Sequence, residues 1–338
     1  MTTVRMSGRY VLVDEIGRGA YGVVWRAWDG RDHVWRAAKV LREADAVFLL
    51  RFLREQAVRI RHPHVVTPVG WAGDDEGVLL TMPLVAGGSL LQLLDERGTL
   101  PAPWAARVAL QLADALSAVH AEGVTHRDVK PGNVLLRPTG AGEPHAYLGD
   151  FGIARREEDP RLTEGSLVLG TRRYLAPEAW EAGSTAPPID VFAAGVLLAQ
   201  LRLGLAADAP ALRAAPPEPL LAIAAAMTHE DPAARPTPAQ VRAAIDATGL
   251  AHAPLDGSVV VPDRLPPLPA GWTAEGPGTD ETGRWQRAAE AASALRIQAS
   301  APTAPPARAS RRGLLLPAAL VTVGAALCAA AVALLLPR

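Results

Sequence analysis

Three glycines in the stretch IGRGAYGVVW, namely Gly17, Gly19 and Gly22, follow the spacing G-x-G-x-x-G. Glycine lets backbone N–H groups approach phosphate oxygens closely, so this spacing predicts a phosphate-binding loop. Alone it is weak, because it occurs both in dinucleotide-binding folds and in loops that cover ATP. A dinucleotide site needs a helix after the glycines, whereas VVWRAWD alternates and favours a strand. The sequence therefore predicts a hairpin that folds over the phosphates of ATP.

Four further motifs occur along the chain. They are RAAK at 36–39, THRDVKPGNVLL at 125–136, GDFGIA at 149–154 and LAPE at 175–178. In this order they resemble the protein kinase family, and within it the bacterial membrane-anchored serine/threonine kinases of the eukaryotic-like type. The resemblance covers residues 8–248 and implies transfer of the γ-phosphoryl group of ATP to protein serine or threonine hydroxyls, with Mg²⁺ or Mn²⁺.

The resemblance assigns roles to the catalytic segment. Asp128 matches the catalytic aspartate, which accepts or orients the proton of the attacking hydroxyl, and Lys130 would steady the γ-phosphate. Asn133 and Asp150 match the residues that hold Mg²⁺ through oxygen ligands, as a hard cation prefers. His126 is expected to support the backbone rather than to act as a base.

The remaining residues of the expected ATP site lie mostly before residue 90. Lys39 matches the lysine that contacts the α- and β-phosphates, and Glu55 is the candidate for its counter-charge, with Glu43 a weaker one. The resemblance implies contacts with adenine and the hinge from Val24, Ala37, Met82, Pro83, Val85 and Leu135, and with phosphates from Gly17, Gly19 and Gly22.

Other matched residues are expected to support the fold. Glu178 and Arg235 match an ion pair under the substrate platform, and Asp190 matches the aspartate that braces the catalytic loop. These roles are structural even if the kinase interpretation is right.

The resemblance also bears on regulation and specificity. Arg127 matches an arginine that often pairs with a phosphorylated activation loop. The loop over 150–178 contains Thr163, Ser166 and Thr171, and we hypothesise autophosphorylation at Thr163 or Ser166. Thr171 is expected to be a fixed contact near the catalytic residues. Lys130 and the pair Gly170–Thr171 favour serine/threonine specificity.

These residues need a two-lobed α+β fold to position them. Alternating strand patterns predict a β-rich N-lobe over residues 8–82, with one helix at 47–60, and helical spacing predicts a C-lobe over 86–248. The segment between Asp190 and Arg235 is shorter than the family pattern, which leaves the mode of substrate docking open.

The C-terminal quarter has a different composition. Residues 251–312 contain nine prolines and few large apolar side chains, which predicts a disordered juxtamembrane linker. Residues 314–336 carry no charge, and a helix of this length spans about 34 Å against a hydrocarbon core of about 30 Å. Arg308, Arg311 and Arg312 precede it and favour a cytoplasmic location for that side. The sequence thus predicts a single-pass, tail-anchored protein of the cell membrane with a cytoplasmic kinase domain.

The overall charge and the cysteine count exclude some classes. Lys and Arg number 34 against 35 Asp and Glu, which gives no support for nucleic-acid binding by the whole protein. The single cysteine, Cys328, excludes a disulfide within the chain. The oligomeric state stays open, and the resemblance suggests a face-to-face homodimer for activation.

Three other functions fit parts of the sequence. A pseudokinase scaffold usually lacks the lysine, aspartate or asparagine, and all are intact here. A small-molecule phosphotransferase of related fold lacks the LAPE segment and the activation loop. The LPPLP stretch at 265–269 could serve as a ligand for polyproline-binding domains, although an inert spacer is the simpler interpretation.

Overall fold

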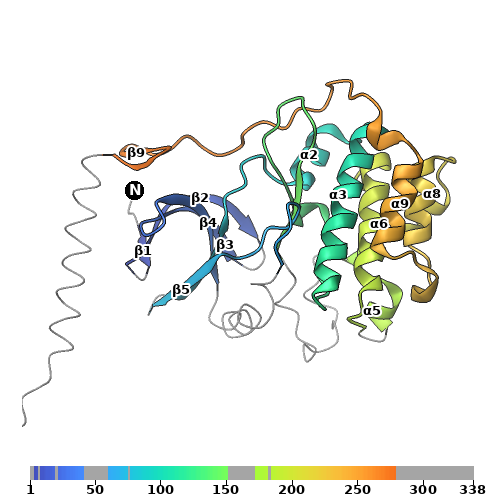
Figure 1. The fold of residues 1–338 in the computed structure, drawn as a ribbon, viewed down its shortest axis with the longest axis horizontal. Coiled ribbons are helices and arrows are strands. Elements are labelled where there is room, and N and C mark those ends of the chain that lie inside the picture. Colours follow the sequence, from blue (N-terminus) through green and yellow to red (C-terminus); the bar gives the residue numbers. More distant parts are fainter. Residues whose placement is uncertain are drawn as a thin grey trace, which may run out of the picture. The chain divides into compact units, whose positions relative to one another are not determined.

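The computed structural model describes residues 4–6, 8–19, 22–41, 60–74, 77–150, 172–181 and 184–278. The chain divides into two compact units, residues 1–289 and 290–338, and every described residue belongs to the first. Within that unit, strands come first and helices follow (Figure 1). The predicted order of a β-rich N-lobe and a helical C-lobe is therefore confirmed.

The N-lobe is an antiparallel sheet of six strands in the order β1-β2-β3-β4-β6-β5. The strands are β1 (Val4–Met6), β2 (Tyr10–Gly19), β3 (Gly22–Asp29), β4 (Val34–Leu41), β5 (Gly70–Asp74) and β6 (Gly77–Pro83).

Alternation along these strands gives the sheet two apolar faces. The first face carries a core of Tyr10, Leu12, Ala27, Ala38 and Leu79. The opposite one, called here the second face, carries Val11, Val13, Trp28 and Trp35. Residues that pair across the strands lie on the same side, so the pairs Trp28–Trp35, Arg26–Ala37 and Val24–Lys39 follow one another along the second face.

The C-lobe is built on two long helices. Helix α3 (Ala102–Ala121) starts with a proline in its first turn, and helix α6 (Pro188–Leu203) is buried continuously from Ile189 to Leu201. A helix that is apolar on all sides must be surrounded by protein, and α6 lies at the centre of the lobe. The shorter elements are α2 (Leu90–Arg97), η2 (Pro131–Asn133), β7 (Val134–Leu136), β8 (Ala146–Leu148), α5 (Pro177–Glu181), α7 (Ala209–Arg213), α8 (Pro219–Met227), η3 (Pro232–Ala234), α9 (Pro238–Ala247) and η4 (Leu250–His252).

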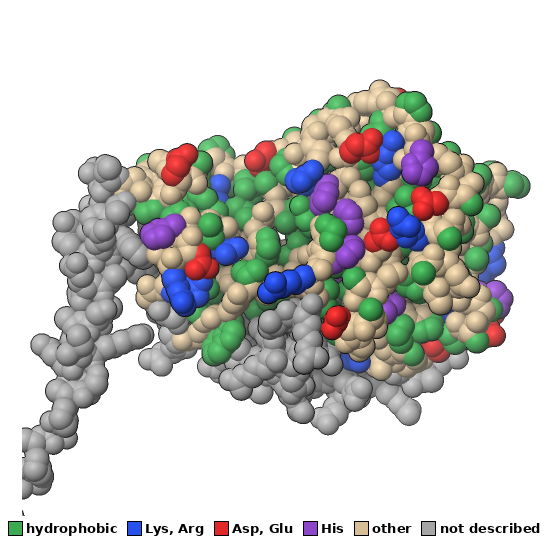
Figure 2. All heavy atoms as spheres, in the orientation of Figure 1, with side chains coloured by type: hydrophobic (Ala, Val, Ile, Leu, Met, Phe, Trp, Pro, Cys, Tyr) green, Lys and Arg blue, Asp and Glu red, His purple; other side chains and the backbone are tan. Residues whose placement is uncertain are grey.

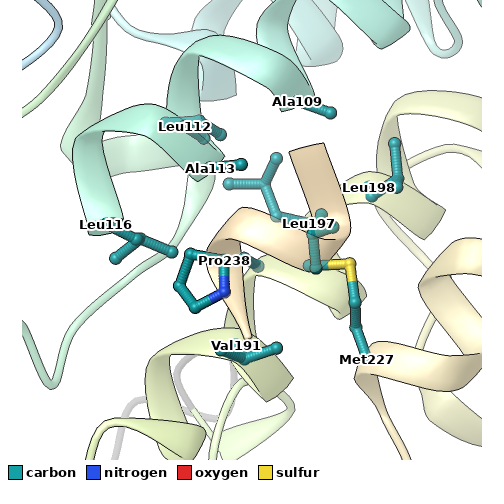
Figure 3. Close-up of a pocket in the computed structure, with 11 residues that line it drawn as sticks. Ala109, Leu112, Ala113, Leu116, Val191, Leu197, Leu198, Met227 and Pro238 are labelled. Carbon is teal, nitrogen blue, oxygen red and sulfur yellow. The ribbon is translucent and has the colours of Figure 1, made fainter. Parts of the chain in front are cut away.

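A small gap remains in the C-lobe core between these helices (Figure 3). Leu112 and Leu116 of α3, Leu197 of α6 and Met227 of α8 line it, and its volume is about 20 Å³. Such a space holds at most one water, and a water needs polar partners, which these apolar side chains do not supply. The gap is a packing defect rather than a ligand site.

The prediction of a disordered linker over 251–312 is wrong for its first part. Residues 251–278 are packed against the body, and the segment crosses from the helical lobe to the sheet, where it ends in the small hairpin β9 (Trp272–Thr273) and β10 (Gly276–Pro277) (Figure 1). Composition misled because the segment is held by backbone hydrogen bonds and a few buried side chains rather than by a core of its own. The packed domain therefore continues well beyond residue 248.

The later C-terminal predictions fall on residues that the structure does not describe. These are the remainder of the expected linker, 279–312, and the apolar stretch 314–336. Among the described residues, no helix combines the length and the apolar character that crossing a bilayer requires.

Charges are mixed on the surface. On the face drawn in Figure 2, basic and acidic side chains of the described residues lie among one another and form no large area of one sign. This agrees with the balanced composition.

Candidate active site

The glycine loop lies in the β2–β3 hairpin, as the strand–loop–strand pattern predicts. Gly17 pairs with Val24 and Gly19 pairs with Gly22 in the antiparallel register. Gly22 has φ +141°, and a Cβ there would lie 2.3 Å from the carbonyl oxygen of Val40. Only glycine lets the start of β3 approach the β4 backbone this closely, two residues before Val24, which pairs with Lys39.

Lys39 links the two lobes. It lies on β4 opposite Val24, and its Nζ forms an ion pair with a carboxylate oxygen of Asp150, which follows β8 in the C-lobe. The Lys39 side chain is 12% exposed and that of Asp150 is 48% exposed. The expected counter-charge Glu55 lies outside the described residues, so its pairing with Lys39 stays a prediction.

Three side chains of the catalytic segment meet at one carboxylate. Asp128 Oδ2 accepts hydrogen bonds from Lys130 Nζ and from Asn133 Nδ2, both at 2.8 Å. Asn133 Nδ2 also donates to the Asp128 carbonyl oxygen at 2.7 Å. The turn of η2 brings Asn133 back to Asp128, because Asn133 N–H donates to the Lys130 carbonyl at 2.9 Å. The spacing D-x-K-x-x-N thus becomes a compact group with one shared acceptor.

The segment before Asp128 is held by a buried carboxylate. Asp190, 1% exposed on α6, accepts the backbone N–H groups of His126 at 2.7 Å and Arg127 at 2.8 Å, and it bonds His120 Nε2 at 2.8 Å. Arg127 has φ +67°, a conformation that side chains other than glycine rarely adopt. The Asp190 bonds hold this strained turn and so fix the position of Asp128.

Comparison with known proteins agrees with this arrangement. Residues 10–207, more than half of the chain, match the protein kinase domain. The chain belongs to the protein kinase domain family.

Several curated relatives carry the name serine/threonine-protein kinase. PkaA of Streptomyces coelicolor is 42% identical over 59% of this chain and 39% of its own length. PknD of Mycobacterium tuberculosis is 38% identical over 74% of this chain and 37% of its own length. PkaB of S. coelicolor is 38% identical over 59% of this chain and 50% of its own length. The matched part therefore spans about two fifths to one half of these relatives.

The adenine-contacting residues expected of a kinase come from both lobes. Val24, Ala37 and Met82 lie on the second face of the sheet, and Ala37 pairs with Met82 across β4 and β6. Leu135 lies in β7 of the C-lobe, where it forms a bridge with Ser89. Pro83 ends β6, and Val85 follows it in the connection between the lobes, residues 83–89, called here the hinge.

The donor atoms suit the Mg²⁺ ions that protein kinases use. Both N–H groups of Asn133 Nδ2 bond to Asp128, which leaves its Oδ1 as the atom for a cation. Asp150 adds a carboxylate, and both are hard oxygen ligands. Within the described residues no group of three His, Cys, Asp or Glu side chains could hold a metal. Asn133 and Asp150 would therefore share a bound Mg²⁺ with phosphate oxygens and water.

His126 supports the backbone and has no access to a substrate. It is 1% exposed, its Nε2 bonds the Gly149 carbonyl at 3.0 Å, and its Nδ1 accepts the Asp128 N–H at 3.3 Å. These partners require a neutral ring that is protonated on Nε2. Burial lowers the pKa of His126 below its ordinary value, which favours that neutral ring.

Arg127, directly before the catalytic aspartate, offers a cation. Its Nε is buried and has no hydrogen-bond partner within the part of the chain that the structure describes. The residues expected to be modified or fixed in the loop, Thr163, Ser166 and Thr171, lie outside the described residues.

The ion pair expected beneath the substrate platform is present. Arg235, with its side chain 1% exposed, donates to Glu178 at 2.5 and 2.8 Å and lies 5.0 Å from the Phe192 ring. Burial raises the pKa of Glu178, but the Arg235 hydrogen bond, a backbone hydrogen bond and the Arg235 charge together bring it below its ordinary value. The pair joins α5 to the loop before α9.

Two functional contacts had no signal in the sequence. One is His120 at the end of α3, which shares the Asp190 carboxylate, and the other is the direct contact of Lys39 with Asp150. Both join residues that are distant in the chain, and neither belongs to a motif that predicts the partner.

The histidines predict how stability depends on pH. Burial lowers the pKa of His126, His64 and His145 below the ordinary value near 6.5. Between the lowered pKa and that value, the unfolded chain binds more protons than the folded chain. The free energy of unfolding should therefore decrease as pH falls below about 6.5, measured by urea unfolding at several pH values.

A variant separates this effect from general acid destabilisation. His145→Gln should flatten the decrease below about pH 6.5, since it removes one of the three groups. Val260→Ala, at an exposed position with no titratable group, is the control and should leave the pH dependence unchanged. Stability that rises towards pH 5.5 would contradict the assignment.

Proposed function

We propose that this chain is an ATP-dependent serine/threonine protein kinase. The observation that carries the proposal is the group of Asp128, Lys130 and Asn133, held by Asp190 and facing the lobe that supplies Lys39. Membership of the kinase domain family supports it. The relatives named serine/threonine-protein kinase support serine and threonine hydroxyls as the acceptors of the phosphoryl group.

The reaction moves one phosphoryl group. The bond between the γ-phosphorus and the oxygen that bridges it to the β-phosphate breaks, and a bond from the γ-phosphorus to the substrate hydroxyl oxygen forms. The hydroxyl proton passes to the Asp128 carboxylate, and ADP leaves with the bridging oxygen. Catalysis depends on holding an anionic group in line with the hydroxyl, so positioning and charge matter most.

Different residues of the active site bind the phosphates, the metal ion and the hydroxyl. Lys130 would bind the γ-phosphoryl oxygens, and Lys39 would exchange its contact with Asp150 for the α- and β-phosphates. Mg²⁺ bound by Asn133 and Asp150 would neutralise the charge that develops on the phosphates. The bonds from Lys130 and Asn133 keep Asp128 oriented until the hydroxyl arrives.

Substitution of the catalytic aspartate tests the proposal. Asp128→Asn in the full chain removes the proton acceptor but keeps the shape, so phosphate transfer to a basic protein should fall by at least about 100-fold. The assay uses radiolabelled ATP and Mg²⁺. Asp95→Asn, at an exposed site on α2, is the matched control and should retain wild-type activity. Equal incorporation in the two variants would sink the proposal.

Regulation through the activation loop is a second part of the proposal. The buried Nε of Arg127, which has no hydrogen-bond partner among the described residues, supports phosphorylation of Thr163 or Ser166, because a phosphate would supply an acceptor. Mass spectrometry of active protein should find phosphate on one of these two residues. Arg127→Ala should reduce the increase in activity that this phosphate causes. An unmodified loop in fully active protein would contradict this.

The rate of autophosphorylation tests whether a homodimer is needed for activation. If one copy phosphorylates another, the initial rate of autophosphorylation per molecule rises with protein concentration. A rate that does not depend on concentration would exclude this route.

We also propose a membrane location with the kinase domain on the cytoplasmic side. The apolar run 314–336, preceded by three arginines, supports it. Deletion of residues 313–338 should release the protein from membranes and leave phosphate transfer intact. Fractionation of cells that express either form measures this, and persistent membrane association of the deleted form would count against a sole anchor.

A further inference from the structure

The segment of residues 253–278, called here the strap, joins the C-lobe to the N-lobe by a second route (Figure 1). Six prolines in it restrict the backbone to extended conformations and reduce the entropy lost on ordering. The hinge is the covalent route between the same two lobes.

The strap begins on the C-lobe. Arg107 Nη2 of α3 donates to the Ala253 carbonyl at 2.8 Å. Val261 exchanges two backbone hydrogen bonds with Gly140, at 2.8 and 3.0 Å. Val259 and Val261 are 3% and 2% exposed and join the C-lobe core.

The middle of the strap binds the hinge. Arg264 N–H donates to the Ala86 carbonyl at 2.7 Å, and its guanidinium forms two bonds of 2.6 Å with Glu96 of α2. Gly88 leaves room for this side chain, because a Cβ there would lie 2.4 Å from Arg264 Cδ. The strap therefore follows the hinge closely rather than passing it at a distance.

The end of the strap lies against the second face of the sheet. Trp35 Nε1 donates to the carbonyls of Thr273 and Ala274 at 3.2 and 3.0 Å, and the Trp35 and Trp272 rings are 5.3 Å apart. Gly276 contacts the Trp28 ring, where a Cβ would come within 2.5 Å. Nearer the hinge, Arg26 Nη2 donates to the Pro267 carbonyl at 3.3 Å.

The second face is also the one that carries the expected nucleotide contacts. Along β4, Trp35, Ala37 and Lys39 alternate onto this face, and along β3, Trp28, Arg26 and Val24 do the same. Arg26 pairs with Ala37, lies 5.7 Å from the Trp35 ring and forms an ion pair with Asp14 at 2.7 Å. The strap and the adenine contacts thus share one surface of one rigid sheet.

We infer that the strap is a positioning element of the kinase, which sets the tilt of the N-lobe over the nucleotide. The inference rests on the proposed function. The hinge, the Lys39–Asp150 ion pair and the bonds of His64 and Val66 with Leu148 join the two lobes, and the strap adds anchors on the hinge and on the second face of the sheet. Trp272 and Arg264 act through Trp35 and the hinge, and neither is a catalytic residue. Residues 253–278 therefore belong to the catalytic unit.

The test uses the full chain and two variants, Trp272→Ala and Arg264→Ala, with Val260→Ala as the matched control. Val260 lies in the strap, and its side chain is 47% exposed. We expect the KM for ATP to rise by about tenfold in the two variants, because a small misplacement of the sheet misaligns the phosphates. The KM for the protein substrate should not change. A KM for ATP equal to that of Val260→Ala would overturn the inference.

Exchanging the charges of Glu96 and Arg264 distinguishes loss of their ion pair from misfolding of the variants. Glu96→Arg and Arg264→Glu should each raise the KM for ATP, and the double variant should restore it, since Glu96 is exposed and the half-buried Arg264 pairs with it directly. Thermal unfolding verifies that all the variants are folded. If they are folded and the double variant does not restore the KM for ATP, the strap does not position the N-lobe through this ion pair.

Direct nucleotide binding separates the failure of this inference from failure of the proposed function. The fluorescent analogue mant-ATP with Mg²⁺ is titrated into the same proteins. If no form transfers phosphate, the proposed function fails, yet weaker mant-ATP binding by Trp272→Ala than by Val260→Ala would still support the strap. Equal binding by both variants would overturn it.

Discussion

The carboxylate of Asp190 is the interaction on which the active site depends. It lies in helix α6, which is buried continuously from Ile189 to Leu201, and an unpaired charge there would be very costly. Two backbone N–H groups and His120 satisfy it, and in return they hold Arg127 in a strained conformation. The position of Asp128, and through it those of Lys130 and Asn133, follows from this one buried group.

The catalytic residues could be predicted from the sequence because the chemistry requires them at short spacings. A turn of η2 converts the spacing of Asp128, Lys130 and Asn133 into contacts, so the motif itself contains most of the geometry. The glycine hairpin was predictable for a similar reason, since the strand pattern after Gly22 excludes a helix.

The strap could not be predicted in this way. Most of its hydrogen bonds are accepted by backbone carbonyls, either its own, such as those of Pro267 and Thr273, or those of Ala86 and Gly140, and any residue can supply a carbonyl. Its prolines and exposed residues resemble a linker in composition. The role of Trp272 becomes clear only from its contact with the Trp35 ring in the folded structure. The composition of a segment shows that it cannot form a core of its own, but it does not show whether a neighbouring surface can bind the segment.

The position of the hairpin at residues 271–278 has a mechanical consequence. Gly278 N–H donates to the Gly271 carbonyl at 2.7 Å, and the hairpin that these residues close lies on Trp28 and Trp35 of the sheet. A force applied to the chain after residue 278 is therefore delivered to the strand lobe and not to the helical one. It acts first on the sheet and through it on the hinge, rather than on the part of the C-lobe that the Glu178–Arg235 ion pair supports.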